Sequence, residues 1–194
     1  MKKQNIILSI CAAVAMTFCL PSHAQRLIPK QKGMEVVSSV PLIKGEKLFA
    51  KDNFGVGVSL TRYLKRENYA FVGVEYEQQN MPYRDYGVKN KDVLLQVGYM
   101  HPILSDNGKN VFLYGGISVL GGYEELNGDK KLLPDGATLL DRSRFVYGGA
   151  VHGSVEVFLT DRLLFLVKVQ GRLLFGSDVH RFRPALSAGI RFNL

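Results

Sequence analysis

Both cysteines of the 194-residue sequence lie within its first 24 residues. That segment has two leading lysines, a mostly apolar run over residues 6–20 and a small-residue pattern ending at Ala24, which is typical of a secretory signal peptide. The apolar run is short for a helical membrane anchor. We therefore expect residues 1–24 to be cleaved and residues 25–194 to form a single mature domain. A cysteine-free mature chain excludes a disulfide framework, a thiolate nucleophile and a cysteine-ligated metal.

Long hydrophobic runs and helical patterns are also missing after residue 24. No stretch reaches 18 continuous apolar residues, and no window places apolar residues convincingly at i, i+3 and i+4. These two absences exclude a helical membrane protein. Removing the two signal lysines lowers the net charge from +8 to +6, and no run of five like charges occurs. Scattered charge favours a solvated surface, so we expect no direct nucleic-acid partner.

The sequence is instead dominated by alternation with a period of two. In NFGVGVSLTRYL (residues 53–64), Phe54, Val56 and Val58 alternate with glycine and serine. This period predicts β-strands, and it recurs along the whole mature chain. The predicted strands cover residues 33–43, 53–64, 69–78, 92–100, 110–123, 144–159, 163–175 and 186–194.

The residues between the apolar positions indicate which solvent the strands face. They are largely glycine, serine and alanine, with a few charges. This is sparse cover for a surface in water, but it suits the filled interior of an eight-stranded barrel. Longer connections at 43–52, 79–91, 124–143 and 176–183 alternate with shorter ones, as in outer-membrane barrels. We therefore predict an all-β fold: an eight-stranded antiparallel up-and-down barrel of outer-membrane type, after a short extended segment (25–33).

The lack of tryptophan is unusual for such a barrel, because interfacial girdles commonly contain it. We expect aromatic residues near the strand ends to form the girdles: Tyr63, Tyr69, Tyr99, Phe145 and Phe175. The alternative fold interpretation is a soluble periplasmic lipocalin-like binding protein, in which the apolar faces would turn inward.

Charged and polar side chains on the small-residue face are expected to form a polar network in the lumen. Glu156 is expected to pair with Lys168 or Arg172 on the next strand, and Glu75 and Glu77 with interior arginines. The predicted network consists of Glu75, Glu77, Gln96, His152, Glu156, Lys168, Arg172 and Arg191.

One pair of residues suggests catalysis. His152 and Ser154 in VHGSVE share a strand face, as a base and a serine nucleophile would, so an outer-membrane lipid hydrolase is an alternative function. However, the two side chains start about 7 Å apart along a strand, too far for a routine hydrogen bond. No histidine spacing fits a metal site, LNGDKKLLPDG lacks EF-hand spacing, and no phosphate loop occurs. We therefore predict no enzymatic activity, no cofactor, no metal and no small-molecule substrate.

Two loops and the last strand are the candidate interaction elements. Exposed apolar residues on the longer loops are candidate partner contacts: Met81, Tyr83, Tyr86, Leu132 and Leu133. An equal alternative is that the leucines extend the strands as a hairpin. The final strand carries alternating apolar residues to its end, and Ile190, Phe192 and Leu194 resemble the C-terminal signal for barrel assembly. That signal commonly ends in an aromatic residue, which Leu194 is not.

Several segments together resemble the TraO family of conjugal-transfer proteins from Bacteroides-type conjugative transposons. They are AQRLIPKQKGMEV, GGISVLGGYEELN, LLPDGATLL, FVYGGAVHGSVEVFLTDR and FRPALSAGIRFNL, in this order along the mature chain. The resemblance implies a component of the DNA-transfer apparatus in the outer part of the envelope, and it supplies no catalytic residues. The expected location is the outer membrane, with the periplasm as the alternative. The expected partners are other conjugation proteins and outer-membrane lipid.

Overall fold

The computed structural model describes residues 28–42, 53–83, 86–126, 143–177 and 181–194, and these residues form a β-barrel. Apart from one short 3-10 turn (η1, Lys65–Glu67), every element is a strand. Within the described ranges, no helix is long and apolar enough to cross a membrane. The strands are β1 (Lys32–Pro41), β2 (Phe54–Tyr63), β3 (Tyr69–Tyr83), β4 (Tyr86–Ser105), β5 (Val111–Leu126), β6 (Ser143–Phe158), β7 (Leu163–Phe175) and β8 (Phe182–Asn193).

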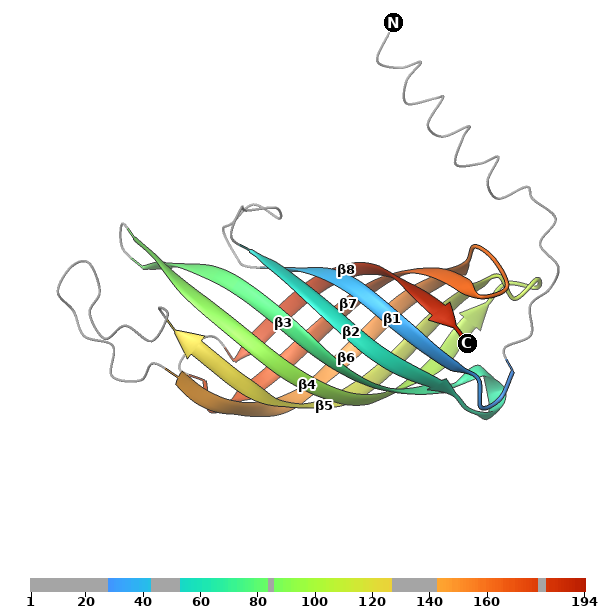
Figure 1. Ribbon diagram of the computed structural model, residues 1–194, viewed down its shortest axis with the longest axis horizontal. Helices are drawn as coiled ribbons and strands as arrows, with labels where there is room; N and C mark the ends of the chain where they lie inside the picture. The colour runs from blue at the N-terminus through green and yellow to red at the C-terminus, as the bar shows by residue number, and fades with distance from the viewer. Residues whose placement is uncertain (1–27, 43–52, 84–85, 127–142, 178–180) are drawn as a thin grey trace, which may run out of the picture.

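Each strand pairs antiparallel with its neighbours in sequence, and β8 pairs with β1 to close the barrel (Figure 1). The closing register places Val36 opposite Ile190. Because the sheet closes on itself, its strands leave no unpaired edge. The predicted eight-stranded antiparallel barrel is confirmed.

The outward face of the strands is apolar and the inward face is polar, as expected for a barrel in lipid. Outward residues are apolar and exposed, such as Ile117 at 65% and Val119 at 66%. Inward residues include buried charged groups on most strands, such as Glu77 and Arg172. The apolar faces therefore turn outward, and the lipocalin-like alternative is wrong.

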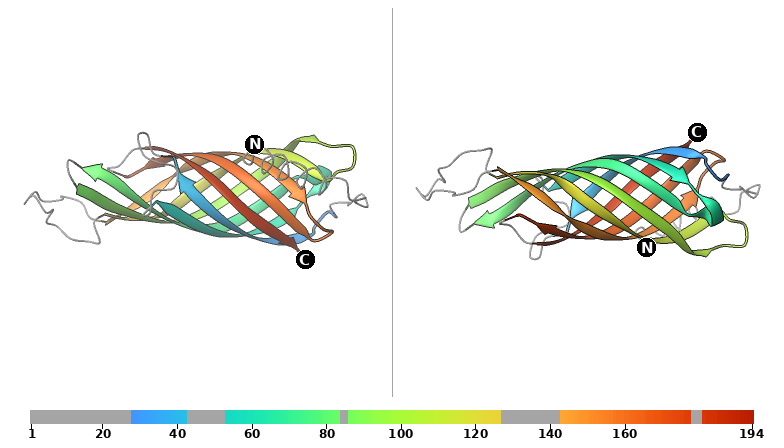
Figure 2. Two further views of the ribbon diagram at one scale, coloured as in Figure 1. Left: turned by 90° about the horizontal axis from the view of Figure 1, so that it is seen from above. Right: turned by 90° about the horizontal axis from the view of Figure 1, so that it is seen from below.

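We call the end of the barrel where β1 begins and β8 finishes the terminal end. It also carries the connections 64–68, 106–110 and 159–162. At the opposite end, β3 and β4 extend beyond their neighbours (Figures 1 and 2). The barrel is elongated, and its strands are tilted relative to its long axis (Figure 2).

Small inward residues make room for large ones. Gly98 on β4 lies under the ring of Phe71 on β3, so that a Cβ at this position would stand 2.5 Å from a ring carbon. It would also stand 2.7 Å from the carbonyl oxygen of Ile117. Glycine is thus required here by close approach of neighbouring strands. The same logic explains why the inward face is rich in glycine and serine.

The β3–β4 connection is much shorter than the alternation pattern suggests. Residues 79–91 were expected to be a loop, but Met81 pairs with Val88 and Tyr83 with Tyr86 in the strand ladder. Likewise β4 continues to Ser105, which leaves only 106–110 as the next turn. The physical reason is that outward residues beyond the apolar band no longer need to be apolar. The period of two therefore fades while backbone pairing continues.

Closure of the barrel predicts a change in gel mobility on heating. Without boiling, the detergent-extracted protein should migrate as a compact folded band, since no strand edge is open to unfolding. After boiling it should move to the position of the unfolded chain. The measurement is electrophoresis of heated and unheated samples side by side, and identical mobility would contradict a detergent-resistant barrel.

Candidate functional site: the polar lumen

Arg191 is the centre of the lumen cluster nearest the terminal end. Its side chain is 0% exposed and reaches carboxylates on two other strands. Its Nη2 donates to Glu35 Oε2 at 2.7 Å, and its Nη1 donates to Glu156 Oε2 at 2.6 Å. The two nitrogens also donate to the hydroxyls of Tyr63 and Tyr69, both at 2.8 Å. One guanidinium therefore connects β8 with β1, β2, β3 and β6 through charge-assisted bonds.

The expected partner of Glu156 was wrong. Neither Lys168 nor Arg172 forms an ion pair with it among the described residues; Arg191 does. The register explains the difference, because Lys168 lies opposite Ser154 on β6 and Leu166 lies opposite Glu156. Inside a narrow barrel, a long side chain meets residues across the lumen as easily as those on the adjacent strand.

Aromatic rings close the terminal end of the lumen. The rings of Tyr63 and Tyr69 lie 5.5 Å apart, and those of Tyr69 and Tyr114 lie 5.0 Å apart, each pair edge to face. The guanidinium carbon of Arg191 lies 4.3 Å from the Tyr69 ring centroid, in a cation–π geometry. Tyr63 and Tyr69 were expected on the outer girdle, and this was wrong. The girdle candidates that do face outward are Tyr99, Phe145 and Phe175.

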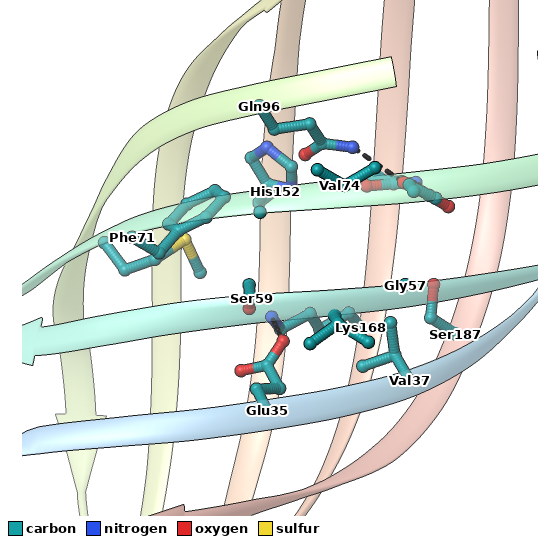
Figure 3. A pocket seen from close by; sticks show the side chains of 15 residues that line it. Glu35, Val37, Gly57, Ser59, Phe71, Val74, Gln96, His152, Lys168 and Ser187 are labelled. Carbon is teal, nitrogen blue, oxygen red and sulfur yellow. Dashed lines mark hydrogen bonds and ion pairs between the residues drawn. The ribbon is translucent and has the colours of Figure 1, made fainter. Parts of the chain in front are cut away.

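The middle of the lumen contains a small cavity of about 40 Å³. Figure 3 shows Lys168 and Glu35 joined by an ion pair on one side of it, with Gln96 and His152 on the other. Glu75 accepts a hydrogen bond from Gln96 Nε2 at 2.6 Å and from Gln170 Nε2 at 3.2 Å. The cavity is thus lined by both apolar and polar side chains, and the polar ones hold one another in place.

His152 and Ser154 share the inward face of β6 but are not hydrogen-bonded to each other. His152 Nε2 lies 2.8 Å from Ser118 Oγ, and its ring packs edge-on against Phe71. Ser154 Oγ donates to Glu156 Oε1 at 3.5 Å. Both residues are buried in the lumen, and the cavity there borders His152 but not Ser154 and is far smaller than a lipid, so the geometry does not support the lipid-hydrolase alternative.

Toward the opposite end the lumen holds two further cation–carboxylate groups. Arg172 forms an ion pair with Glu77, and its Nη1 lies 3.9 Å from Glu75 Oε1. Closer to the opposite end, Arg183 forms ion pairs with Asp92, at 2.5 Å, and with Glu124. All six side chains are buried.

The structure therefore places all eight predicted network residues inside the barrel. It adds four charged residues that the sequence interpretation missed: Glu35, Asp92, Glu124 and Arg183. Glu35 had a detectable signal, because it stands at an inward position between Met34 and Val36. Arg183 fell in a segment expected to be a loop, so no strand pattern marked it.

The other candidate residues are separate from this lumen. Ile190, Phe192 and Leu194 point outward from the end of the chain. Met81, Tyr83 and Tyr86 belong to β3 and β4 rather than to a loop, and their side chains are not described. The predicted signal peptide and the two loop residues Leu132 and Leu133 lie outside the described residues.

The lumen offers no evident reaction centre. Within the described ranges, no group of three or more His, Cys, Asp and Glu side chains could hold a metal ion. The charged groups form ion pairs with one another in a column along the barrel, from Glu35 and Arg191 to Asp92 and Arg183, although Nε and Nη1 of Arg172 have no hydrogen-bond partner among the described residues. Such a column fills the barrel.

Solved structures support the architecture. The attachment invasion locus protein Ail of Yersinia pestis, solved with the heparin analogue sucrose octasulfate, is 11% identical, with a TM-score of 0.54 over 86% of this chain and 100% of that one. Neisserial surface protein A is 14% identical, with a TM-score of 0.53 over 84% of this chain and 96% of that one. At these identities the similarity concerns the fold alone.

Sequence comparison is more specific. No curated protein sequence matches the chain. The family described as conjugative transposon protein TraO matches residues 28–194. The matched region includes every strand of the barrel, from Lys32 to Asn193. The chain therefore belongs to the TraO family of conjugative transposon proteins.

Proposed function

We propose that this protein is a non-enzymatic outer-membrane component of the apparatus that transfers DNA in conjugation. The family match over the whole barrel carries the proposal. The exposed apolar outer wall supports an outer-membrane location, because only a closed barrel leaves no unsatisfied strand edge in lipid. In this proposal residues 1–24 direct export and are removed.

The filled lumen supports a role carried by surfaces rather than by a channel. Arg191 and the tyrosines around it occupy the terminal end, and eight strands leave room only for side chains. DNA cannot pass through such an interior. The protein therefore acts through the ends of its barrel, by contacting and stabilising other envelope proteins of the apparatus.

Gene deletion tests the proposal. Removing this protein from an otherwise intact conjugative element should reduce transfer to below detection, and supplying it from a second locus should restore transfer. The donor outer membrane should contain the protein, with none in the soluble periplasmic fraction. Undiminished transfer after deletion would refute a role in the apparatus, whereas recovery from the periplasm would refute the location.

A further inference from the structure

Exposed basic side chains gather in one sector of the terminal end. They come from the start of β1, the end of β2 and the turn after it: Lys30, Lys32, Arg62, Lys65 and Arg66. None of them has an ion pair with another described residue. The one acidic residue of this turn, Glu67, is engaged by Lys109. Among the residues that the structure describes, this sector, which we call the basic rim, therefore has five exposed basic side chains without an ion pair.

Two residues of the basic rim face each other across neighbouring strands. Lys32 and Arg62 are directly opposite in the β1–β2 register. Their neighbours Gly33 and Thr61 are buried in the lumen, so both basic side chains point outward. Side chains opposite each other have Cβ atoms about 5 Å apart, and like charges in this position destabilise a sheet. An anion between the two side chains would remove this cost.

The same two residues lie at the edge of the apolar outer band. The next outward residues along the strands are Met34 and Leu60, which are opposite each other and exposed. Two residues along a strand correspond to about 7 Å. Lipid chains packed against Met34 and Leu60 would therefore place their phosphate groups beside Lys32 and Arg62.

Tyr99 completes the surroundings of this pair on the outer wall. Arg62 lies opposite Ala70, and Ala70 lies opposite Tyr99, so that the row runs from β1 to β4. Tyr99 is exposed, and tyrosine is enriched where lipid chains meet headgroups. The small side chain of Ala70 leaves space between the guanidinium and the phenol ring.

We propose that Lys32 and Arg62 bind the phosphate of an anionic phospholipid in the leaflet at the terminal end of the barrel. This leaflet is the periplasmic one, because short turns face the periplasm in barrels of this type. A lipid fits better than an acidic protein, because the pair lies on the side wall directly next to the apolar band. The inference rests on the membrane location given above.

Lipid retention measured by native mass spectrometry tests this site. The purified barrel in detergent is offered equal amounts of phosphatidylglycerol and phosphatidylcholine, and the bound lipids are counted. The unmodified protein should retain phosphatidylglycerol preferentially, by about fivefold for each basic side chain involved. The double variant Lys32→Gln with Arg62→Gln should lose this preference.

The matched control removes two positive charges outside the basic rim, through Arg162→Gln at the same end and Arg181→Gln at the opposite end, and it keeps Lys109 because that residue engages Glu67. It should keep the preference. Equal retention of both lipids by the unmodified protein, or equal loss in the control, would overturn the site. So would a double variant that keeps its lipid preference but fails in conjugation, because the basic rim would then contact an acidic protein. The heat-dependent gel shift separates these outcomes from failure to form a barrel in the membrane.

Discussion

Replacing Arg191 with methionine should lower the free energy of unfolding by about 3–5 kcal/mol, because the change breaks a buried ion pair by removing one partner. Methionine fills similar space but donates no hydrogen bond. Glu156 would lose its cation, since Arg191 supplies its only ion pair among the described residues. Glu35 would keep Lys168 as a partner but lose two hydrogen bonds. The tyrosine hydroxyls of the aromatic end would lose a donor as well.

The measurement is urea unfolding of the barrel in lipid vesicles, followed by the folded and unfolded bands in unheated gels. Arg162→Met is the control, because Arg162 is an exposed residue at the same end of the barrel. It should change stability by less than about 0.5 kcal/mol. Adding Glu156→Gln to Arg191→Met should recover part of the loss, since the unpaired carboxylate would then be neutral. If the single variant is as stable as the control, the cluster does not stabilise the barrel.

A charged residue introduced on the outer wall should lower the free energy of unfolding, and the loss should depend on how deep the residue lies in the bilayer. Val119 is exposed near the middle of β5, with Val97 and Gly149 as its lateral neighbours. Val119→Arg should destabilise the barrel by about 2–4 kcal/mol if this position lies in the bilayer interior. The same unfolding experiment measures the effect.

Leu159→Arg is the matched control, because it introduces the same charge at an exposed position near the end of the barrel instead of its middle. Leu159 is also exposed, but it lies in the 159–162 connection at the terminal end, beyond the last residue of β6. Arginine there should cost about 0–1 kcal/mol, because its guanidinium reaches the headgroups. Equal effects at the two positions would contradict a membrane-embedded wall. A stabilising effect of Val119→Arg would indicate that this face meets water.

Alternation in the sequence was sufficient to predict the barrel, because every second residue of a strand in contact with lipid must be apolar. This requirement holds only where the strand is in contact with lipid. Alternation therefore found the central parts of all eight strands but missed the ends of β3 and β4, where Met81 and Tyr83 continue the ladder. The same alternation places Tyr63 in phase with Thr61 and Tyr69 in phase with Phe71, on the inward face. The assignment of these two tyrosines to the girdle went against it, and both point into the lumen.

The membership of the lumen network was easier to predict than its pairing. An inward position follows from strand phase, which is local, so Glu75, Arg172 and Arg191 were identified from neighbouring residues. The partner of each charge depends on the tilt and stagger of strands around the barrel, which no local pattern encodes. This is why Glu156 was assigned to the next strand although its cation comes from β8. The phase of Glu35 also marks it as inward, and only its partners on β7 and β8 lie beyond a local pattern.

The seam between β1 and β8 has a consequence for the time course of folding. Glu35 and Arg191 are separated by 156 positions in the chain, and so are among the most distant partners it contains. Contacts between residues so far apart in the sequence form slowly, because most of the chain must be ordered before they are possible. Until β8 arrives, β1 has an open edge and one buried carboxylate lacks its guanidinium, and an open edge favours aggregation. Closure of the seam completes the backbone ladder and the ion-pair cluster in the same event, so partly assembled forms of this barrel gain little stability.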